Sequence, residues 1–178
     1  EPPVVKIKPR PDDRARLQRD RFGDDRRRAR EYARRWAYWR NPLFYNFTGI
    51  GGDCTNFISQ CLLAGCCTMN CRETFGWYYN SSYDRTPSWT GVQYLYDFLT
   101  ANEGSGPWGR DADIDELQIG DIVQLGGADG RFYHTLLITG YRPGTYLVAA
   151  HSFDAFDRPL VSYNYARLRP IRIEGYRA

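Results

Sequence analysis

The sequence predicts an α+β domain in which helices come first and strands follow in a mostly antiparallel sheet. Apolar residues recur at helical spacing in three segments of the first 104 residues. After that point, short runs rich in β-branched and aromatic residues alternate with glycine-containing turns. At 178 residues, with 42% hydrophobic and 25% charged residues, the chain has the size and composition of one soluble globular domain.

The first predicted helix covers residues 24–40, after an arm that opens with "EPPVVKIKPRP". Its prolines predict an arm that is partly extended over residues 1–23, so we place the domain at 24–178. One face of the helix is mostly apolar and ends on an arginine: Ala29, Tyr32, Ala33, Trp36, Ala37 and Arg40. The "NP" that follows ends the helix, because proline disfavours the helical conformation of the preceding residue.

A second helix is predicted from Asp53 to Gly65. Its apolar stripe consists of Phe57, Ile58, Cys61, Leu62 and Ala64. Gly65 is expected to end it, since glycine is the usual residue after the last helical turn. Residues 66–89 are expected to form a long aromatic loop, and "TGVQYLYDFLTANEG" (90–104) a third helix.

The strands are predicted in the second half of the chain. The β-rich runs are "IGDIVQLG" (119–126), "RFYHTLLITG" (131–140) and "GTYLVAAHS" (144–152), and "LRPIRIEGY" (168–176) is a further candidate. Runs in this order, joined by short turns, favour antiparallel pairing.

Charge and cysteine content narrow the function classes. The net charge is +3, and the arginines of residues 9–31 alternate with aspartates, which is typical of a solvated helix and not of a nucleic-acid site. No run of 18 apolar residues is present, so no membrane span is predicted. The spacing of Cys66, Cys67 and Cys71 is not that of a zinc site, so neither a metal nor another cofactor is predicted. Disulfides among these three and Cys61 stay open.

Cys54 is the candidate nucleophile. If Asp53 caps the second helix, the thiol lies at the first helical position, beside unpaired backbone N–H groups and the positive end of the helix dipole. We expect that environment to lower the thiol pKa and to stabilise an oxyanion. Gly51 and Gly52 leave room for a substrate. The negative charge of Asp53 opposes the thiolate, and a core role for the cysteine stays open.

A cysteine nucleophile needs a base, and the chain has two histidines, His134 and His151. His134 lies near the start of one predicted strand and His151 at the end of the next. If these strands form a hairpin, both histidines lie at one end of the sheet. The predicted arrangement has Cys54 attack and His134 shuttle the proton, while His151 or Asp154 orients the imidazole.

Six motifs in this order resemble a known family: "DCTNFISQCLLAG", "GWYY", "SWTGVQYLYDFL", "GDIVQL", "YHTLLITG" and "AAHSFD…RPL". They are similar to the bacterial putative amidase domain family, of the papain-like superfamily that includes NlpC and CHAP cell-wall hydrolases. The resemblance covers about residues 25–170. It implies a papain-like fold with the catalytic cysteine heading a helix packed on an antiparallel sheet.

Carried over to this chain, the resemblance implies that Cys54 is the nucleophile and His134 the general base. His151 occupies the place of the orienting residue, with Asp154 or Asp157 as alternatives. Asp53 matches the acidic residue before the cysteine and, with Trp77, Tyr78 and Trp89, is an expected substrate-binding residue. Tyr79 belongs to the same aromatic loop, and the alternative use of these rings is to seal the core.

The implied activity is cleavage of amide bonds in peptidoglycan stem peptides or at the sugar–peptide linkage. Acyl transfer through the same thioester is an alternative, and so is a non-catalytic module that binds the cell wall or a spore structure. The expected partner is peptidoglycan or another peptide, without nucleic acid. An extracellular or wall-associated location is favoured, with the cytoplasm as the alternative, and the oligomeric state is not predicted.

Overall fold

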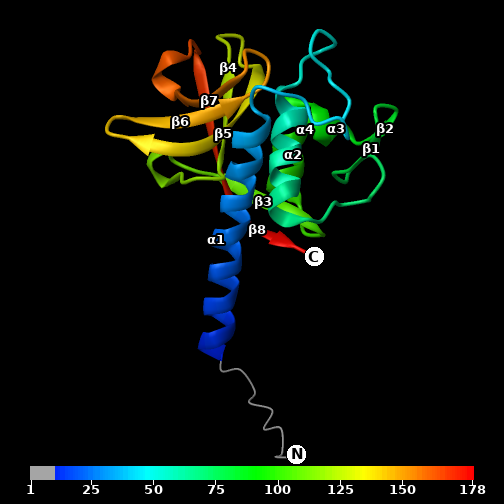
Figure 1. Ribbon diagram of the computed structural model, residues 1–178, viewed down its shortest axis with the longest axis vertical. Helices are drawn as coiled ribbons and strands as arrows, with labels where there is room; N and C mark the ends of the chain where they lie inside the picture. Colours follow the sequence, from blue (N-terminus) through cyan, green and yellow to red (C-terminus); the bar gives the residue numbers. More distant parts are fainter. Residues whose placement is uncertain (1–10) are drawn as a thin grey trace, which may run out of the picture.

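The computed structural model describes residues 11–178 and contains a six-stranded antiparallel sheet with the long helices packed on one face (Figure 1). The helices are α1 (Pro11–Trp36), α2 (Cys54–Cys66), α3 (Pro87–Thr90) and α4 (Val92–Ala101). The strands are β1 (Tyr79–Ser81), β2 (Asp84–Arg85), β3 (Gly106–Asp111), β4 (Ile122–Gly126), β5 (Phe132–Arg142), β6 (Thr145–Ala150), β7 (Ala155–Pro159) and β8 (Arg167–Arg177). Two short 3-10 helices, η1 (Ile114–Glu116) and η2 (Leu160–Ser162), complete the list. The α+β class is therefore confirmed.

The sheet has the strand order β3-β8-β4-β5-β6-β7, so the last strand lies between two earlier ones. Strands β4, β5 and β6 follow one another as neighbours, as their short connections predicted, and β7 pairs next to β6. All pairs in this sheet are antiparallel. The predicted strand regions correspond to β4, β5, β6 and β8, whereas β3 and β7 were not predicted. A separate hairpin, β1–β2, lies within the predicted aromatic loop.

The α1 helix differs from its prediction at both ends. It begins at Pro11, so residues 11–23 of the predicted extended arm are helical, and it ends at Trp36 instead of Arg40. Proline is well suited to the first helical position, and aspartates 12 and 13 favour a helix N-terminus. Arginine, leucine and alanine are strong helix formers, which explains the earlier start. Residues 1–10 of the arm lie outside the described residues.

The α2 helix begins and ends close to its prediction, but its final residues differ. Gly65 lies inside the helix, and Cys67 provides the left-handed C-cap at φ 57°. A Cβ atom on residue 65 would lie 2.8 Å from the backbone oxygen of Asp25 in α1. Gly65 therefore allows α1 and α2 to approach closely and does not end the helix.

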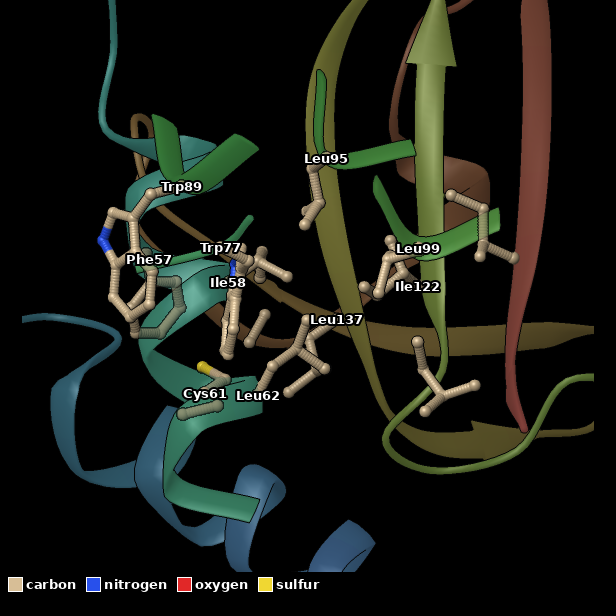
Figure 2. Packing of buried hydrophobic residues seen from close by; sticks show 14 of the residues in the cluster. Phe57, Ile58, Cys61, Leu62, Trp77, Trp89, Leu95, Leu99, Ile122 and Leu137 are labelled. Carbon is tan, nitrogen blue, oxygen red and sulfur yellow. The ribbon is translucent and has the colours of Figure 1, made fainter. Parts of the chain in front are cut away.

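Two apolar clusters cover the two faces of the sheet. The first contains Ile122 and Leu137 of the sheet and packs against α1, α2, α3 and α4 (Figure 2). The second contains the strand neighbours Val123 and Leu136, which point to the opposite face. The other buried residues of this cluster are Leu117, Leu125, Ile138, Val148, Ala150 and Leu160. The face that a β-strand residue occupies can thus be read from its cluster.

Arg26 ties α1 to the sheet. Its guanidinium donates a 2.7 Å hydrogen bond to the buried carboxylate of Asp121 and further bonds to the backbone oxygens of Ile119 and Ile173.

Across residues 11–178, the helices are too short or too polar for any of them to cross a bilayer.

Candidate active site

Cys54 is the first residue of α2, as predicted from the sequence, and its side chain is buried with 9% exposure. The chain reaches it through a loop in which Gly51 and Gly52 have φ values of 80° and 99°. Those left-handed conformations favour glycine, and a Cβ atom at either position would meet open space. Gly51 and Gly52 therefore add no side chain to the segment that leads to Cys54.

Asp53 occupies the N-cap position, but its carboxylate does not cap α2. It accepts hydrogen bonds from the backbone N–H of Phe47 and the side chain of Asn56, each at 2.9 Å. Its second oxygen lies 2.7 Å from Nδ1 of His151 and 3.4 Å from Nε of Arg40. The predicted cap is thus replaced by a buried ionic contact that fixes the start of the helix.

His151 lies on the helix-facing side of the sheet, beside Asp53. Its ring stacks on Phe57 with centroids 3.8 Å apart, and its Nε2 lies 2.9 Å from the backbone oxygen of Trp36. Asp154 accepts two hydrogen bonds from Arg40, at 2.9 and 3.0 Å. Asp53, His151, Arg40 and Asp154 form one group, which we call the Asp53–His151 cluster.

The sulfur of Cys54 faces the first residues of β5. It lies 3.7 Å from the hydroxyl of Thr55, which is 2.9 Å from the hydroxyl of Thr135. Burial raises the pKa of the Cys54 thiol, and the charge of Asp53 adds to that, against the lowering effect of hydrogen bonds from Thr135 and Thr55. The expected lowering by the helix N-terminus is therefore outweighed, because the thiol is buried.

His134 faces the other side of the sheet. Its pairing partner across β4 is Leu125, which belongs to the second cluster, whereas the adjacent Thr135 pairs with Gln124 on the helix side. The imidazole centroid lies 6.1 Å from the ring of Tyr163. Burial, with the charge of Arg158, lowers the pKa of His134 to about 4, so the ring is neutral at pH 7.

The structure thus brings Cys54 next to the backbone of β5, and His151 and Asp154 next to Asp53. Within residues 11–178, no hydrogen bond or ion pair joins His134 to Cys54, His151 or Asp154. Asp157 accepts a 2.7 Å hydrogen bond from Thr139.

The expected substrate wall lies mostly inside the protein. Trp77 and Trp89 have no exposed surface, and their indole N–H groups donate to Ser59 and Asn56 of α2. Tyr79 is also buried, and Tyr78 is half-buried. The two tryptophans therefore seal the core, which was the alternative reading of this aromatic loop.

Other aromatic side chains are exposed on the loop that leads to Cys54. Trp39 is 71% and Tyr45 45% exposed, and Ile50 of the same loop is 64% exposed. The backbone oxygen of Tyr45 accepts a hydrogen bond from Asn56, so this loop lies against the first turn of α2. These residues were not predicted as ligand contacts, although "LFYNFTGIGG" showed the same aromatic content.

A family model described as "Putative amidase domain" matches residues 23–173. The chain belongs to this family. It is also 33% identical, over 150 residues, to the uncharacterized protein YhbB of Bacillus subtilis (strain 168). That alignment covers 79% of this chain and 47% of the relative, so the chain spans about half of the relative's length. No solved structure gives a significant match.

In this amidase-family domain all five cysteine thiols are free. Cys54, Cys61 and Cys66 are buried, whereas Cys67 and Cys71 are exposed. No group of three or more His, Cys, Asp or Glu side chains suited to a metal ion occurs among the residues that the structure describes.

A cavity of about 870 Å³ lies between the loop after α2 and the end of α4. Phe75, Tyr94 and Glu103 are among its lining residues. None of the residues predicted for the amidase site lines this cavity, so it is separate from Cys54.

Sequence reasoning missed Arg40 and three polar residues around the thiol: Thr55, Gln124 and Thr135. Arg40 was visible as an arginine on an otherwise apolar helical face. Thr55 and Thr135 each follow a predicted site residue directly. Their shared contact depends on the packing of α2 on β5, which no local pattern reveals.

Proposed function

We propose that this domain is a cysteine amidohydrolase that cleaves amide bonds in peptidoglycan peptides through a thioester on Cys54. The observation that carries the proposal is the position of Cys54 at the start of α2, in a chain that belongs to an amidase family. A cysteine that heads a helix packed on an antiparallel sheet also supports a papain-like fold and kinship with the NlpC and CHAP types.

The first turn of α2 supports stabilisation of an oxyanion. No side chain caps this helix, so its first N–H groups stay available to a negatively charged oxygen. In the proposed reaction the Cys54 sulfur attacks the carbonyl carbon, and the carbonyl oxygen takes up negative charge beside these groups. The amine then leaves with a proton, and water hydrolyses the thioester.

His134 is the proposed general base. It directly precedes Thr135, whose backbone contacts the sulfur. Its ring faces away from Cys54 in this state. The proposal therefore includes a local rearrangement at the start of β5, which brings the imidazole to the helix side when substrate binds.

His151 is proposed to act on Cys54 indirectly. Its contact with Asp53 holds the residue before the nucleophile, and Arg40 connects both of them to Asp154. We assign this group to positioning the first turn of α2.

The exposed side chains of Trp39, Tyr45 and Ile50 support a ligand with apolar or sugar faces near Cys54. Peptidoglycan stem peptides, attached to amino sugars, have both kinds of surface. The amine acceptor of an acyl transfer would fit the same thioester, and product analysis separates the two reactions.

Incubation with purified muropeptides, followed by mass spectrometry, tests the proposal. We expect cleavage by the wild type and by Cys67→Ser, which removes an exposed thiol away from the site. Cys54→Ala should lower the rate by about a thousandfold or more, and His134→Ala by about a hundredfold or more. Retained cleavage by folded Cys54→Ala would exclude the thioester mechanism.

A further inference from the structure

A chain of polar side chains runs from the Cys54 sulfur through the helix–sheet interface. The hydroxyl of Thr55 lies 3.7 Å from the sulfur and 2.9 Å from the hydroxyl of Thr135. Nε2 of Gln124 lies 3.3 Å from that second hydroxyl. Oε1 of Gln124 accepts two hydrogen bonds from Arg169, at 3.0 and 2.5 Å.

The partners at the far end fix the orientation of the Gln124 amide and the direction of its bond to Thr135. Arginine has only donors, so Oε1 of Gln124 must face Arg169. The amide nitrogen then donates to the backbone oxygen of Val92 at 2.8 Å and to Thr135. Thr135 accepts this bond and keeps its own proton to donate to Thr55, whose proton is then left for the sulfur of Cys54; this direction of the last two bonds is part of the proposal below.

Burial shows that these polar groups are not incidental. Thr55, Gln124 and Thr135 have no exposed surface, although buried polar groups are costly unless they are paired. Valine would fill either threonine position with nearly the same shape. A buried hydroxyl group is stable only when it is hydrogen-bonded, and both threonine hydroxyls have partners within this hydrogen-bond chain.

Arg169 is itself held in place. Its guanidinium lies between the rings of Tyr96 and Phe132, with 3.8 and 3.9 Å to the two centroids. Gln93 accepts two further hydrogen bonds from it, both at 3.1 Å. The fixed positive charge of Arg169 at one end of the hydrogen-bond chain favours negative charge on the Cys54 sulfur at the other end.

We propose that Thr55, Thr135, Gln124 and Arg169 are positioning residues that hold the Cys54 thiol and stabilise its thiolate through a directed hydrogen-bond chain. The inference rests on the proposed role of Cys54 as the nucleophile. None of the four residues needs to contact substrate. Their effect would offset part of the cost of ionising a buried thiol.

One charged group, Asp53, acts directly on the ionisation of Cys54, and the other titratable groups around the thiol lie farther from it. Asp53 precedes it in the chain and opposes the thiolate, while His151 and Arg40 lie against the carboxylate of Asp53. His134 approaches from β5 on the opposite face, and Arg169 from β8 through Gln124. The threonine variants leave all of these groups in place, and Arg169→Met removes only the cation at the far end of the hydrogen-bond chain.

The decisive experiment compares Thr135→Val with Thr139→Val. Thr139 is a fully buried threonine of the same strand whose hydroxyl donates to Asp157 and not toward Cys54. We would follow iodoacetamide alkylation of Cys54 against pH by peptide mass spectrometry, with exposed Cys67 as the reference thiol in the same sample. Thermal unfolding of each variant shows whether it is folded.

Thr135→Val should slow alkylation of Cys54 about tenfold at pH 7 and shift its pH profile upward, with Cys67 unchanged. Thr135→Ser should restore the wild-type profile, and Arg169→Met should shift it in the same direction by a smaller factor. Thr139→Val should leave it unchanged. Equal profiles for wild type, Thr135→Val and Arg169→Met would overturn the proposal.

Alkylation needs no substrate, so the two proposals fail separately. If the alkylation profile shifts but no muropeptide is cleaved, the hydrogen-bond chain is supported and the proposed hydrolysis is rejected. If muropeptides are cleaved but the alkylation profile does not shift, the hydrogen-bond chain is rejected and the proposed hydrolysis is supported.

Discussion

The carboxylate of Asp53 is a buried charge directly beside the proposed nucleophile, with 1% of the residue exposed. Burial raises its pKa, but hydrogen bonds from His151, Asn56 and the Phe47 backbone outweigh this and hold the pKa below its ordinary value of 3.8. The folded protein therefore favours the charged form. Asparagine keeps one acceptor oxygen but replaces the other with an amide donor, so the contacts with the Phe47 N–H and Asn56 or those with His151 and Arg40 lose their acceptor.

At the scale of the residue, we predict that Asp53→Asn lowers the free energy of unfolding by about 3 kcal/mol, as expected for a broken buried ion pair. Asp154→Asn is the matched control, because Asp154 also pairs with Arg40 but its side chain is 29% exposed. Its loss should stay below about 1 kcal/mol. Urea unfolding at pH 7 measures both, and equal losses would show that the buried contact has no special weight.

At the scale of the element, apolar periodicity predicted the three main helices and four strands. Two strands were missed for physical reasons. β3 has the sequence "GPWGRD" and β7 "AFDRP", and glycine, proline and aspartate are poor strand formers. Pairing with β8 and with β6 holds them in the sheet, so their conformation depends on partners distant in sequence.

The contact between α1 and α2 gives a second prediction at this scale. A Cβ atom on residue 65 would lie 2.8 Å from the Asp25 oxygen and 3.1 Å from the hydroxyl of Tyr176. Gly65→Ala should therefore force α1 and α2 apart and cost about 1–3 kcal/mol of unfolding free energy. Thermal or urea unfolding measures this loss.

Gly23 of α1 is the matched control for Gly65. A Cβ atom at residue 23 meets nothing within 4 Å, and alanine favours the helix by about 0.5–1 kcal/mol over glycine. Gly23→Ala should stabilise the protein by about that amount. Destabilisation by both variants, or by neither, would contradict the close helix contact.

At the scale of the whole molecule, the sequence predicted the class of fold and the cysteine at the head of a helix. It did not predict which face of the sheet each histidine occupies. His134 and His151 were both placed at one end of a hairpin, but a shift of one residue in register moves a side chain to the opposite face. Here β5 and β6 pair with an irregularity between Ile138 and Gly140, which no local pattern indicates.

The buried imidazole of His134 links the stability of the whole domain to pH. Its pKa is lowered from 6.5 to about 4 by burial and by Arg158, so the unfolded chain takes up a proton at a higher pH than the folded protein does. The stabilisation is therefore complete above pH 6.5 and is lost as the pH falls toward 4. Asp53 acts in a lower window, because its depressed pKa costs stability only below the ordinary carboxyl range.

We predict that the free energy of unfolding falls by up to about 3 kcal/mol between pH 6.5 and 4, measured by urea unfolding at fixed ionic strength. His134→Gln keeps a polar side chain but cannot titrate, so most of this dependence should disappear. Asp53→Asn should keep the slope in this window and flatten the profile below pH 4. A slope unchanged in His134→Gln would show that the folded protein does not lower the pKa of this ring, and would contradict the burial of His134 as the source of the pH dependence.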